Sequence, residues 1–221
     1  MKANIAIDGP SAAGKSTIAD ALAKNLGYTH LDTGAMYRAV ALKASYENIP
    51  IDDEENIVNM INKMDLDMRP DGSVFLDGED VSNKIRTNEI SMGASNVSKL
   101  LGVRKALVAM QQKICEKGGY ILDGRDIGTV VLKDAPVKIF MIASAEARAQ
   151  RRVKQNIKKG IEGDNYETIL QEIEKRDYQD SHRQNSPLIQ ADDAVLIDTS
   201  NLTVEEVTAE VMKIVNEKLG V

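Results

Sequence analysis

The sequence predicts an α/β fold of three layers, in which helices cover both faces of a five-stranded parallel sheet. Five short apolar runs recur along the 221 residues, and segments with apolar residues at helical spacing separate them. A glycine-rich turn joins the first apolar run to the first helical segment. Strands that alternate with amphipathic helices favour a parallel sheet that is covered on both faces.

The predicted strands and helices follow one another in a regular order. Lys15–Leu26 repeats its apolar residues at helical spacing and predicts the first helix. Thr203–Leu219 carries one apolar stripe behind a capping box formed by Thr203 and Glu206, and it predicts a closing helix. The predicted strands lie at Lys2–Ile7, Tyr28–Leu31, Tyr120–Leu122, Val137–Ile142 and Ala194–Ile197.

Two segments interrupt this alternation. The pairs Asp71-Gly72 and Asp77-Gly78 flank a strand-like run, and such pairs favour tight turns, so a small antiparallel sheet is expected between residues 65 and 80. The charged, glycine-containing segment Lys154–Asn165 is expected to be a linker between two helices that acts as a lid. We therefore expect a core of residues 1–61 and 95–221, an insert of residues 62–94, and a lid within the core at 149–165.

Composition and charge exclude several classes of protein. The formal charge of -6 argues against a surface that follows nucleic acid, because such binding needs a dominant field of lysine and arginine. One cysteine, Cys115, allows no internal disulfide, which is typical of a reducing compartment. No stretch reaches the roughly 18 apolar residues of a membrane span, and no secretory signal begins the chain. We expect a soluble, cytoplasmic monomer.

The strongest local signal is the glycine-rich turn before the first helix. It fills the pattern G-x-x-x-x-G-K-[ST] of a P-loop NTPase, in the strand-to-helix setting that this motif requires. Backbone N–H groups of such a loop face phosphate oxygens, Lys15 is expected to reach the β- and γ-phosphates, and the Ser16 hydroxyl is expected to ligate Mg²⁺. The motif is Gly9-Pro10-Ser11-Ala12-Ala13-Gly14-Lys15-Ser16.

A P-loop alone leaves GTPases, motor ATPases and small-molecule kinases open. Residues 62–65 match the guanine-binding pattern N-K-x-D, but they follow apolar residues at helical spacing rather than a buried strand. No aspartate is followed by glycine three positions later, so the D-x-x-G switch of GTPases is absent from the sequence. A P-loop without these two GTPase motifs favours a small-molecule kinase over a GTPase.

Arginines are placed where a kinase needs cations. Arg38 and Arg125 are expected in turns that directly follow strands, where α/β folds bind ligands. One guanidinium group can bind two phosphate oxygens in a bidentate manner, and it stays charged at working pH. No catalytic base is evident, and a phosphate-ester acceptor needs none, because its second pKa of about 6 leaves a nucleophilic oxyanion at neutral pH. The other arginines of this set are Arg148, Arg151, Arg152, Arg176 and Arg183.

Over essentially its full length the chain resembles the bacterial cytidylate kinases. The segments that carry the resemblance are residues 7–11, 31–38, 78–82, 85–87, 123–131 and 135–140. The resemblance implies a nucleoside monophosphate kinase with a five-stranded parallel core, an insert over the acceptor and a short arginine-bearing lid. The reaction it implies is transfer of the γ-phosphoryl group of Mg-ATP to CMP, and also to dCMP, in pyrimidine nucleotide metabolism.

The resemblance also implies residue roles. Ser95, Arg104 and Asp126 would contact cytosine, whose N4 amino group donates to a carboxylate where uracil presents an oxygen. The acceptor phosphate would be held by Arg38, Arg125 and Arg183, and the ribose and phosphate side by Arg176 and Asp180, with Ser11, Thr33 and Tyr37 nearby. ATP would be held by the loop with Thr17, Arg148 and Arg152. Catalysis is expected from Lys15, Arg125, Arg152 and Arg183.

Three alternatives stay open at this stage. Within enzymes, the alternative is a kinase for another small anion, such as uridine or adenosine monophosphate, or shikimate. From a different class, the chain could be a regulatory or nucleic-acid-binding protein that uses ATP as a switch, although its acidic charge argues against this. The aspartate that orients water around Mg²⁺ is expected to be Asp123, with Asp8 as the second candidate.

Overall fold

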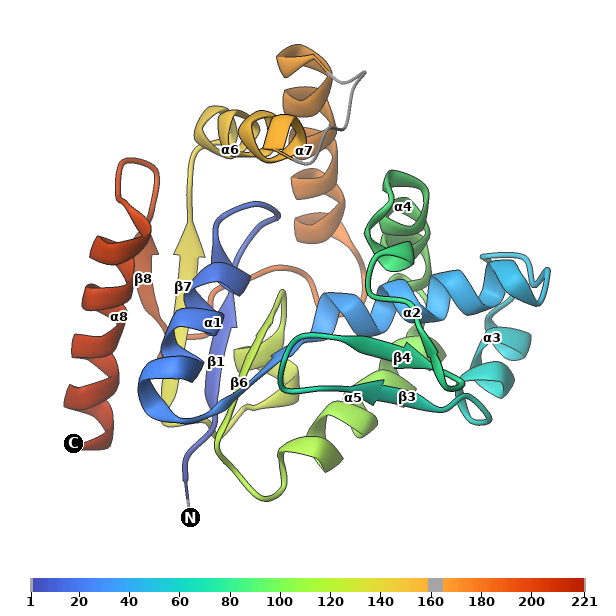
Figure 1. Ribbon diagram of the computed structural model, residues 1–221, viewed down its shortest axis with the longest axis horizontal. Helices are drawn as coiled ribbons and strands as arrows, with labels where there is room; N and C mark the ends of the chain where they lie inside the picture. The colour runs from blue at the N-terminus through green and yellow to red at the C-terminus, as the bar shows by residue number, and fades with distance from the viewer. Residues whose placement is uncertain (1, 159–164, 221) are drawn as a thin grey trace.

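Five parallel strands form the central sheet of the computed structural model, which describes residues 2–158 and 165–220 (Figure 1). Every neighbouring pair of these strands runs parallel, so the predicted sheet is confirmed. Their carboxyl ends therefore meet along one edge, where ligands bind in this class of fold. The order across the sheet is β2 (Thr29–Asp32), β6 (Tyr120–Gly124), β1 (Ile5–Asp8), β7 (Val137–Ile142) and β8 (Val195–Asp198).

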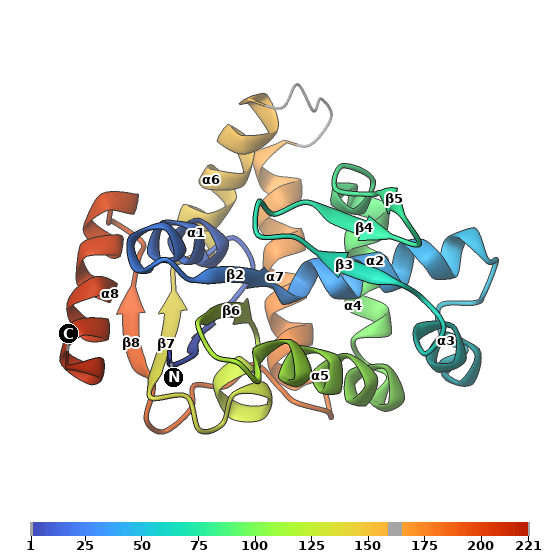
Figure 2. The same cartoon turned by 60° about the horizontal axis from the view of Figure 1, so that its bottom comes forward.

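Alternate strand residues face opposite sides of the sheet and build two apolar cores. On one side, Ile5 and Ile7 pack with residues of α1 (Lys15–Leu26) and α8 (Val204–Leu219). On the other side, Ala6 packs with residues of α2 (Thr33–Tyr46) and α5 (Leu101–Cys115). Figure 2 shows α1 and α8 together on their side of the sheet. This arrangement confirms the three predicted layers.

The predicted helix ends agree closely with the structure at both ends of the chain. Helix α1 covers the expected residues. Helix α8 begins behind the expected capping box, in which Thr203 Oγ1 accepts from the N–H of Glu206 and the Glu206 side chain accepts from the N–H of Thr203. No helix in the described part of the chain has the length and apolar character needed to cross a membrane.

The expected antiparallel sheet is present, and in the sequence it lies between α3 (Glu54–Ile61) and α4 (Asn88–Val97). It consists of β3 (Leu66–Met68), β4 (Val74–Leu76) and β5 (Glu79–Asp80). Asp77 and Gly78 both have positive φ, 50° and 83°, as a two-residue hairpin turn requires. The N-K-x-D segment follows α3 and not a strand of the central sheet. The expected insert boundary between residues 94 and 95 falls within α4.

The lid region differs from the sequence interpretation in one respect. Helix α6 (Ala145–Lys158) extends through Lys154–Lys158, which the sequence assigns to the linker. The helix α7 (Tyr166–His182) begins behind Asn165, whose side chain caps it. The remainder of the expected lid, residues 159–164, lies outside the described residues. Figure 1 shows α6 and α7 beyond the carboxyl ends of the strands, with α4 across from them.

Candidate active site

A tight loop, residues 9–14, joins β1 to α1 at the carboxyl edge of the sheet. Gly9 has φ 148°, and a Cβ atom there would lie 2.0 Å from the carbonyl oxygen of Met141, so only glycine lets the loop pass this close to β7. Gly14 precedes α1 with φ 97°. The amides of the loop and the first turn of α1 present the donors and the positive dipole end that bind phosphate.

Lys15, the first residue of α1, is buried beneath this loop. Its Nζ donates to the carbonyl of Pro10 at 2.7 Å. Burial, and then the positive charge of Arg125, lower the pKa of Lys15 to about 7. A bound polyphosphate would supply the anion that this ammonium group lacks in the free protein.

Two further residues support the outer side of the loop. Arg148 on α6 donates from Nη1 to the carbonyl of Ser11 at 3.2 Å and pairs with both carboxylate oxygens of Asp177 at 3.0 and 2.6 Å. Thr199, which follows β8, donates from Oγ1 to the carbonyl of Ala13 at 3.0 Å. The structure thus brings Arg148 to the loop.

Ser16 and Asp123 meet below the loop. Ser16 Oγ donates to Asp123 Oδ2 at 2.9 Å, and His30 Nε2 lies 2.7 Å from Asp123 Oδ1. Burial alone would raise the pKa of Asp123, but His30, Lys15 and Ser16 outweigh it and lower the pKa. Both oxygens of Asp8, by contrast, accept from the N–H groups of Ile127 and Gly128, at 2.8 and 2.7 Å.

These groups fit a magnesium ion. Mg²⁺ prefers hard oxygen ligands and retains several of its waters. A hydroxyl has one proton and two lone pairs, so Ser16 can donate to Asp123 and still offer a lone pair to a cation. Asp123 is the anion beside it, whereas Asp8 is committed to backbone amides.

His30 links Asp123 to the surface. Its Nδ1 lies 2.6 Å from Asp20 Oδ1 on α1. Burial alone would lower the pKa of His30, but the hydrogen bonds and charges of Asp123 and Asp20 raise it to about 9. Because the folded protein holds this proton more tightly than the unfolded chain, the contribution of His30 to stability is complete below pH 6.5 and disappears as the pH rises through about 9.

We therefore expect His30→Leu to cost more stability at pH 6 than at pH 10. The free energy of unfolding, measured by urea denaturation, should differ between wild type and variant by on the order of 2–3 kcal/mol more at pH 6. Groups that do not contact His30 titrate in both proteins and cancel in this difference, whereas Asp123 loses a partner that lowers its pKa. A difference that is the same at both pH values would contradict the ion pair.

A second group of cations, each partly buried, comes from α2, from α7 and from the turn after β6. Arg125 Nε pairs with Asp180 Oδ2 at 2.7 Å, and Arg38 Nη2 pairs with Asp32 Oδ2 at 2.8 Å. Burial, and then Arg125, lower the pKa of Arg176 to about 10; Arg38 and Arg152 act in the same direction. The Nε atoms of Arg38 and Arg176 are buried without a hydrogen-bond partner among the described residues.

A third cluster is centred on Asp126. One carboxylate oxygen accepts from Arg104 Nη2, and the other lies 3.9 Å from Arg183 Nη2. Arg104 also donates to the carbonyl of Ser98 at 3.2 Å and lies over the ring of Tyr37. Arg104 Nε and Arg183 Nη2 have no hydrogen-bond acceptor within reach in the described part of the chain, although Arg183 Nη2 forms the longer ion pair with Asp126. Asp126 pairs with these two arginines, and Arg125 pairs with Asp180 instead.

Other expected site residues lie as follows. Arg38 is on helix α2, which starts directly after β2, so the turn expected around it is wrong. Ser95 lies within α4, and its carbonyl accepts from Ser98. Thr33 Oγ1 donates to the carbonyl of Asp123 at 2.7 Å, which fixes the end of β6. Arg152 reaches Asn88 at 3.5 Å.

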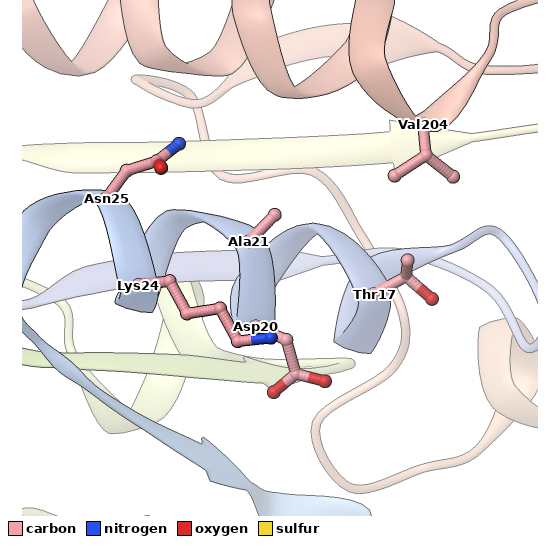
Figure 3. A pocket seen from close by; sticks show the side chains of 6 residues that line it. All are labelled: Thr17, Asp20, Ala21, Lys24, Asn25 and Val204. Atoms are coloured by element: carbon pink, nitrogen blue, oxygen red, sulfur yellow. The ribbon is translucent and has the colours of Figure 1, made fainter.

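The Thr17 side chain is exposed near the start of α1. It lines a surface hollow beside α1, which Figure 3 shows with Asp20, Ala21, Lys24, Asn25 and Val204 along its walls. The hollow lies on the exposed side of α1, so the structure does not bring the Thr17 side chain together with the arginines described above.

No local sequence pattern marks His30, Asp177 or Thr199 as residues of the site. Each contacts the loop or its neighbours through a pairing of distant segments, such as the 93 residues between His30 and Asp123. The adjacency of β2 and β6 is the signal that would have identified His30. Asp177 and Thr199 depend on helix and loop packing that no local pattern reveals.

Comparisons with known proteins agree on one family. The sequence model of the cytidylate kinases matches residues 5–217. The chain is 50% identical over 220 residues to the cytidylate kinase of Ligilactobacillus salivarius (strain UCC118), and the matched region covers 98% of each protein. It is 48% identical over 220 residues to the cytidylate kinase of Bacillus subtilis (strain 168), again over 98% of each. The fold resembles that of a shikimate kinase from Bacteroides thetaiotaomicron, with a TM-score of 0.52, 10% identity and 99% of each chain covered.

Proposed function

Because the chain belongs to the cytidylate kinase family and transfers a phosphoryl group to CMP, we propose that residues 9–16 hold the donor and the buried arginines hold the acceptor. The observation that carries this assignment is a set of buried guanidinium nitrogens that have no hydrogen-bond partner among residues 2–158 and 165–220: Nε of Arg38, Arg104 and Arg176, and Nη2 of Arg183. An unpaired buried donor costs about 1–3 kcal/mol, which an anionic ligand would recover.

On the donor side, we propose that the loop amides and Lys15 bind the β- and γ-phosphates of ATP, with Arg148 and Arg152 beside them. The buried position of Lys15 strengthens its attraction for phosphate, because water screens it little. We propose Ser16 as a ligand of Mg²⁺ and Asp123 as the carboxylate that orients the ion's waters, supported by their hydrogen bond. When bound, the cation neutralises charge on the transferring phosphoryl group.

On the acceptor side, we propose that Arg38, Arg125 and Arg183 hold the phosphate of CMP. Arg176 and Asp180 would hold its ribose side, and Asp180 also fixes Arg125 through their ion pair. Fixed cations on both sides of the reacting atoms stabilise the transition-state charge without a general base, because the attacking phosphate oxygen is already ionised. The residues Ser11, Thr33 and Tyr37 complete this half of the proposed site.

For the base, we propose that Asp126 accepts from the cytosine amino group while Arg104 and Ser95 contact its other polar atoms. Arg104 and Arg183 hold Asp126 in place, so its carboxylate is fixed before the ligand arrives. We extend the proposal to dCMP as a second acceptor. Residues 62–94 are proposed as the acceptor-binding insert and 149–165 as a lid.

We also propose that the protein is a cytoplasmic monomer. Its partners are small nucleotides, and it binds neither nucleic acid nor membranes. The acidic net charge supports it. In the described residues, each large exposed apolar side chain lies on a different element or loop, which supports the monomer.

An acceptor panel with a coupled ADP assay tests this function. We expect turnover with CMP to be fastest and dCMP to react. Uridine monophosphate should react about 5–150-fold more slowly, because one well-placed hydrogen-bond pair discriminates by about 1–3 kcal/mol, and adenosine monophosphate and shikimate should also react more slowly than CMP. Omission of Mg²⁺ should abolish turnover. Failure to form ADP from ATP with CMP would overturn the proposal.

A further inference from the structure

An uninterrupted chain of polar contacts runs from the surface of α1 to the hydroxyl of Ser16. Asp20 contacts His30 at 2.6 Å, His30 contacts Asp123 at 2.7 Å, and Asp123 accepts from Ser16 at 2.9 Å. The exposed fraction of the side chain falls from 62% at Asp20 to 12% at His30 and 7% at Asp123. The outer end of the chain lies on the hollow seen in Figure 3.

The two carboxylates fix the protonation and the orientation of the His30 ring. A carboxylate can only accept, so a ring nitrogen within 2.7 Å of one must donate. Both nitrogens of His30 face carboxylate oxygens, and both donate only in the imidazolium form. Two charge-assisted hydrogen bonds at opposite corners of the ring prevent it from turning.

The orientation of Asp123 decides which atom of Ser16 faces outward. His30 occupies Oδ1 of Asp123, which leaves Oδ2 for the Ser16 proton. While that proton points to Asp123, the lone pairs of Ser16 point away from it and are free for a cation. A carboxylate without its second partner would be free to rotate and to leave Ser16.

We propose that His30 is a positioning residue for magnesium, which acts by fixing Asp123 so that the Ser16 hydroxyl presents a lone pair to the ion. This inference rests on the proposed magnesium site at Ser16. In other metal sites, partners of this kind change metal affinity 10–100-fold when they are replaced.

Mn²⁺, used as a paramagnetic probe in place of Mg²⁺, tests the proposal on the whole protein with ADP bound. We expect His30→Leu to raise the dissociation constant of Mn²⁺ from this complex about tenfold, measured by electron paramagnetic resonance. His30→Gln keeps one donor for Asp123 and should stay within about threefold of wild type. The KM for CMP at saturating Mg²⁺ should be the same in all three proteins.

His182→Leu is the matched control, because His182 is exposed and stacks on Tyr178 far along the chain from the loop. It should leave Mn²⁺ binding unchanged. Asp20→Asn changes an exposed side chain and should raise the dissociation constant about threefold, so it tests the chain of contacts even if His30→Leu fails to fold.

The outcomes separate the two proposals. If the wild-type complex binds Mn²⁺ no more tightly than free ADP does, the magnesium site itself is wrong, and the inference with it. If wild type binds Mn²⁺ and both His30→Leu and Asp20→Asn bind it equally well or more tightly, only the role of His30 is overturned. Tighter binding would mean that the imidazolium acts on the ion by repulsion alone.

Discussion

Replacement of Lys15 by methionine is expected to lower kcat by about 10³-fold, with little change in the KM for CMP. Removal of one preorganised donor from a transition-state site costs about 10²–10³-fold, and the Lys15 ammonium beside a bound phosphate adds positive charge at a buried position. Methionine is unbranched and only one heavy atom shorter than lysine, so the variant should keep the start of α1. Steady-state kinetics with coupled detection of ADP measures the effect.

The same substitution is expected to leave stability unchanged or to raise it. Burial and the neighbouring Arg125 disfavour the charged form of Lys15, as its lowered pKa indicates, so an apolar side chain removes a cost from the folded state. A loss of activity without loss of stability is typical of a residue held for function. Thermal unfolding of the purified variant measures this part.

Lys24→Met is the control on the same helix, because Lys24 is exposed two turns further along α1. Its kcat should stay within twofold of wild type, as expected for an exposed surface substitution. If Lys15→Met and Lys24→Met had similar rates, Lys15 would have no part in the transfer.

Elements with local signals were predicted well from the sequence. The phosphate loop, α1 and the capping box of α8 depend on residues within a few positions of one another, and their predicted limits agree with the structure. The five strands were also found, because their apolar runs are bounded by turns and helical patterns. The Asp77-Gly78 turn is a similar case, since its positive φ angles follow from those two residue types.

The end of α6 was predicted wrongly for a physical reason. Lys154–Lys158 is rich in lysine and has one large apolar residue, Ile157, which is 72% exposed. A solvated helix of this composition has no apolar stripe, so it cannot be separated from a linker by periodicity. Packing of the earlier part of α6 on α7 carries the helix forward.

The partners of the site residues were beyond the sequence analysis because they join distant segments. Asp126 directly follows Arg125 in the sequence, but the fold pairs it with Arg104 and pairs Arg125 with Asp180. These pairings depend on where α5 and α7 cross the edge of the sheet, which no local spacing specifies. The residue types at the site were predictable, while the ion pairs that hold them were not.

Substitution of Asp126 by asparagine is expected to reduce the preference for CMP over UMP by about 10–100-fold, expressed as the ratio of kcat/KM values. The carboxylate only accepts, which suits the amino group of cytosine and opposes the oxygen of uracil. An amide has both a donor and an acceptor, so it no longer rejects uracil. The KM for ATP should change less than twofold, because Asp126 contacts Arg104 and Arg183 and not the loop.

Asp126→Ala should lower the same ratio but also cost stability. It leaves Arg104 and Arg183 buried without their carboxylate, and the loss of one partner from a buried ion pair costs about 3–5 kcal/mol. Asparagine keeps the shape and is the better probe of selectivity.

Asp177→Asn supplies the matched control, since it changes an aspartate that pairs with an arginine on the donor side. It should raise the KM for ATP through Arg148 and leave the ratio of CMP to UMP unchanged. If Asp126→Asn kept the wild-type ratio, Asp126 would hold the two arginines without contacting the base. Selectivity would then have to come from the guanidinium of Arg104, whose donors favour the cytosine carbonyl and ring nitrogen, and Arg104→Lys would be expected to lower the ratio instead.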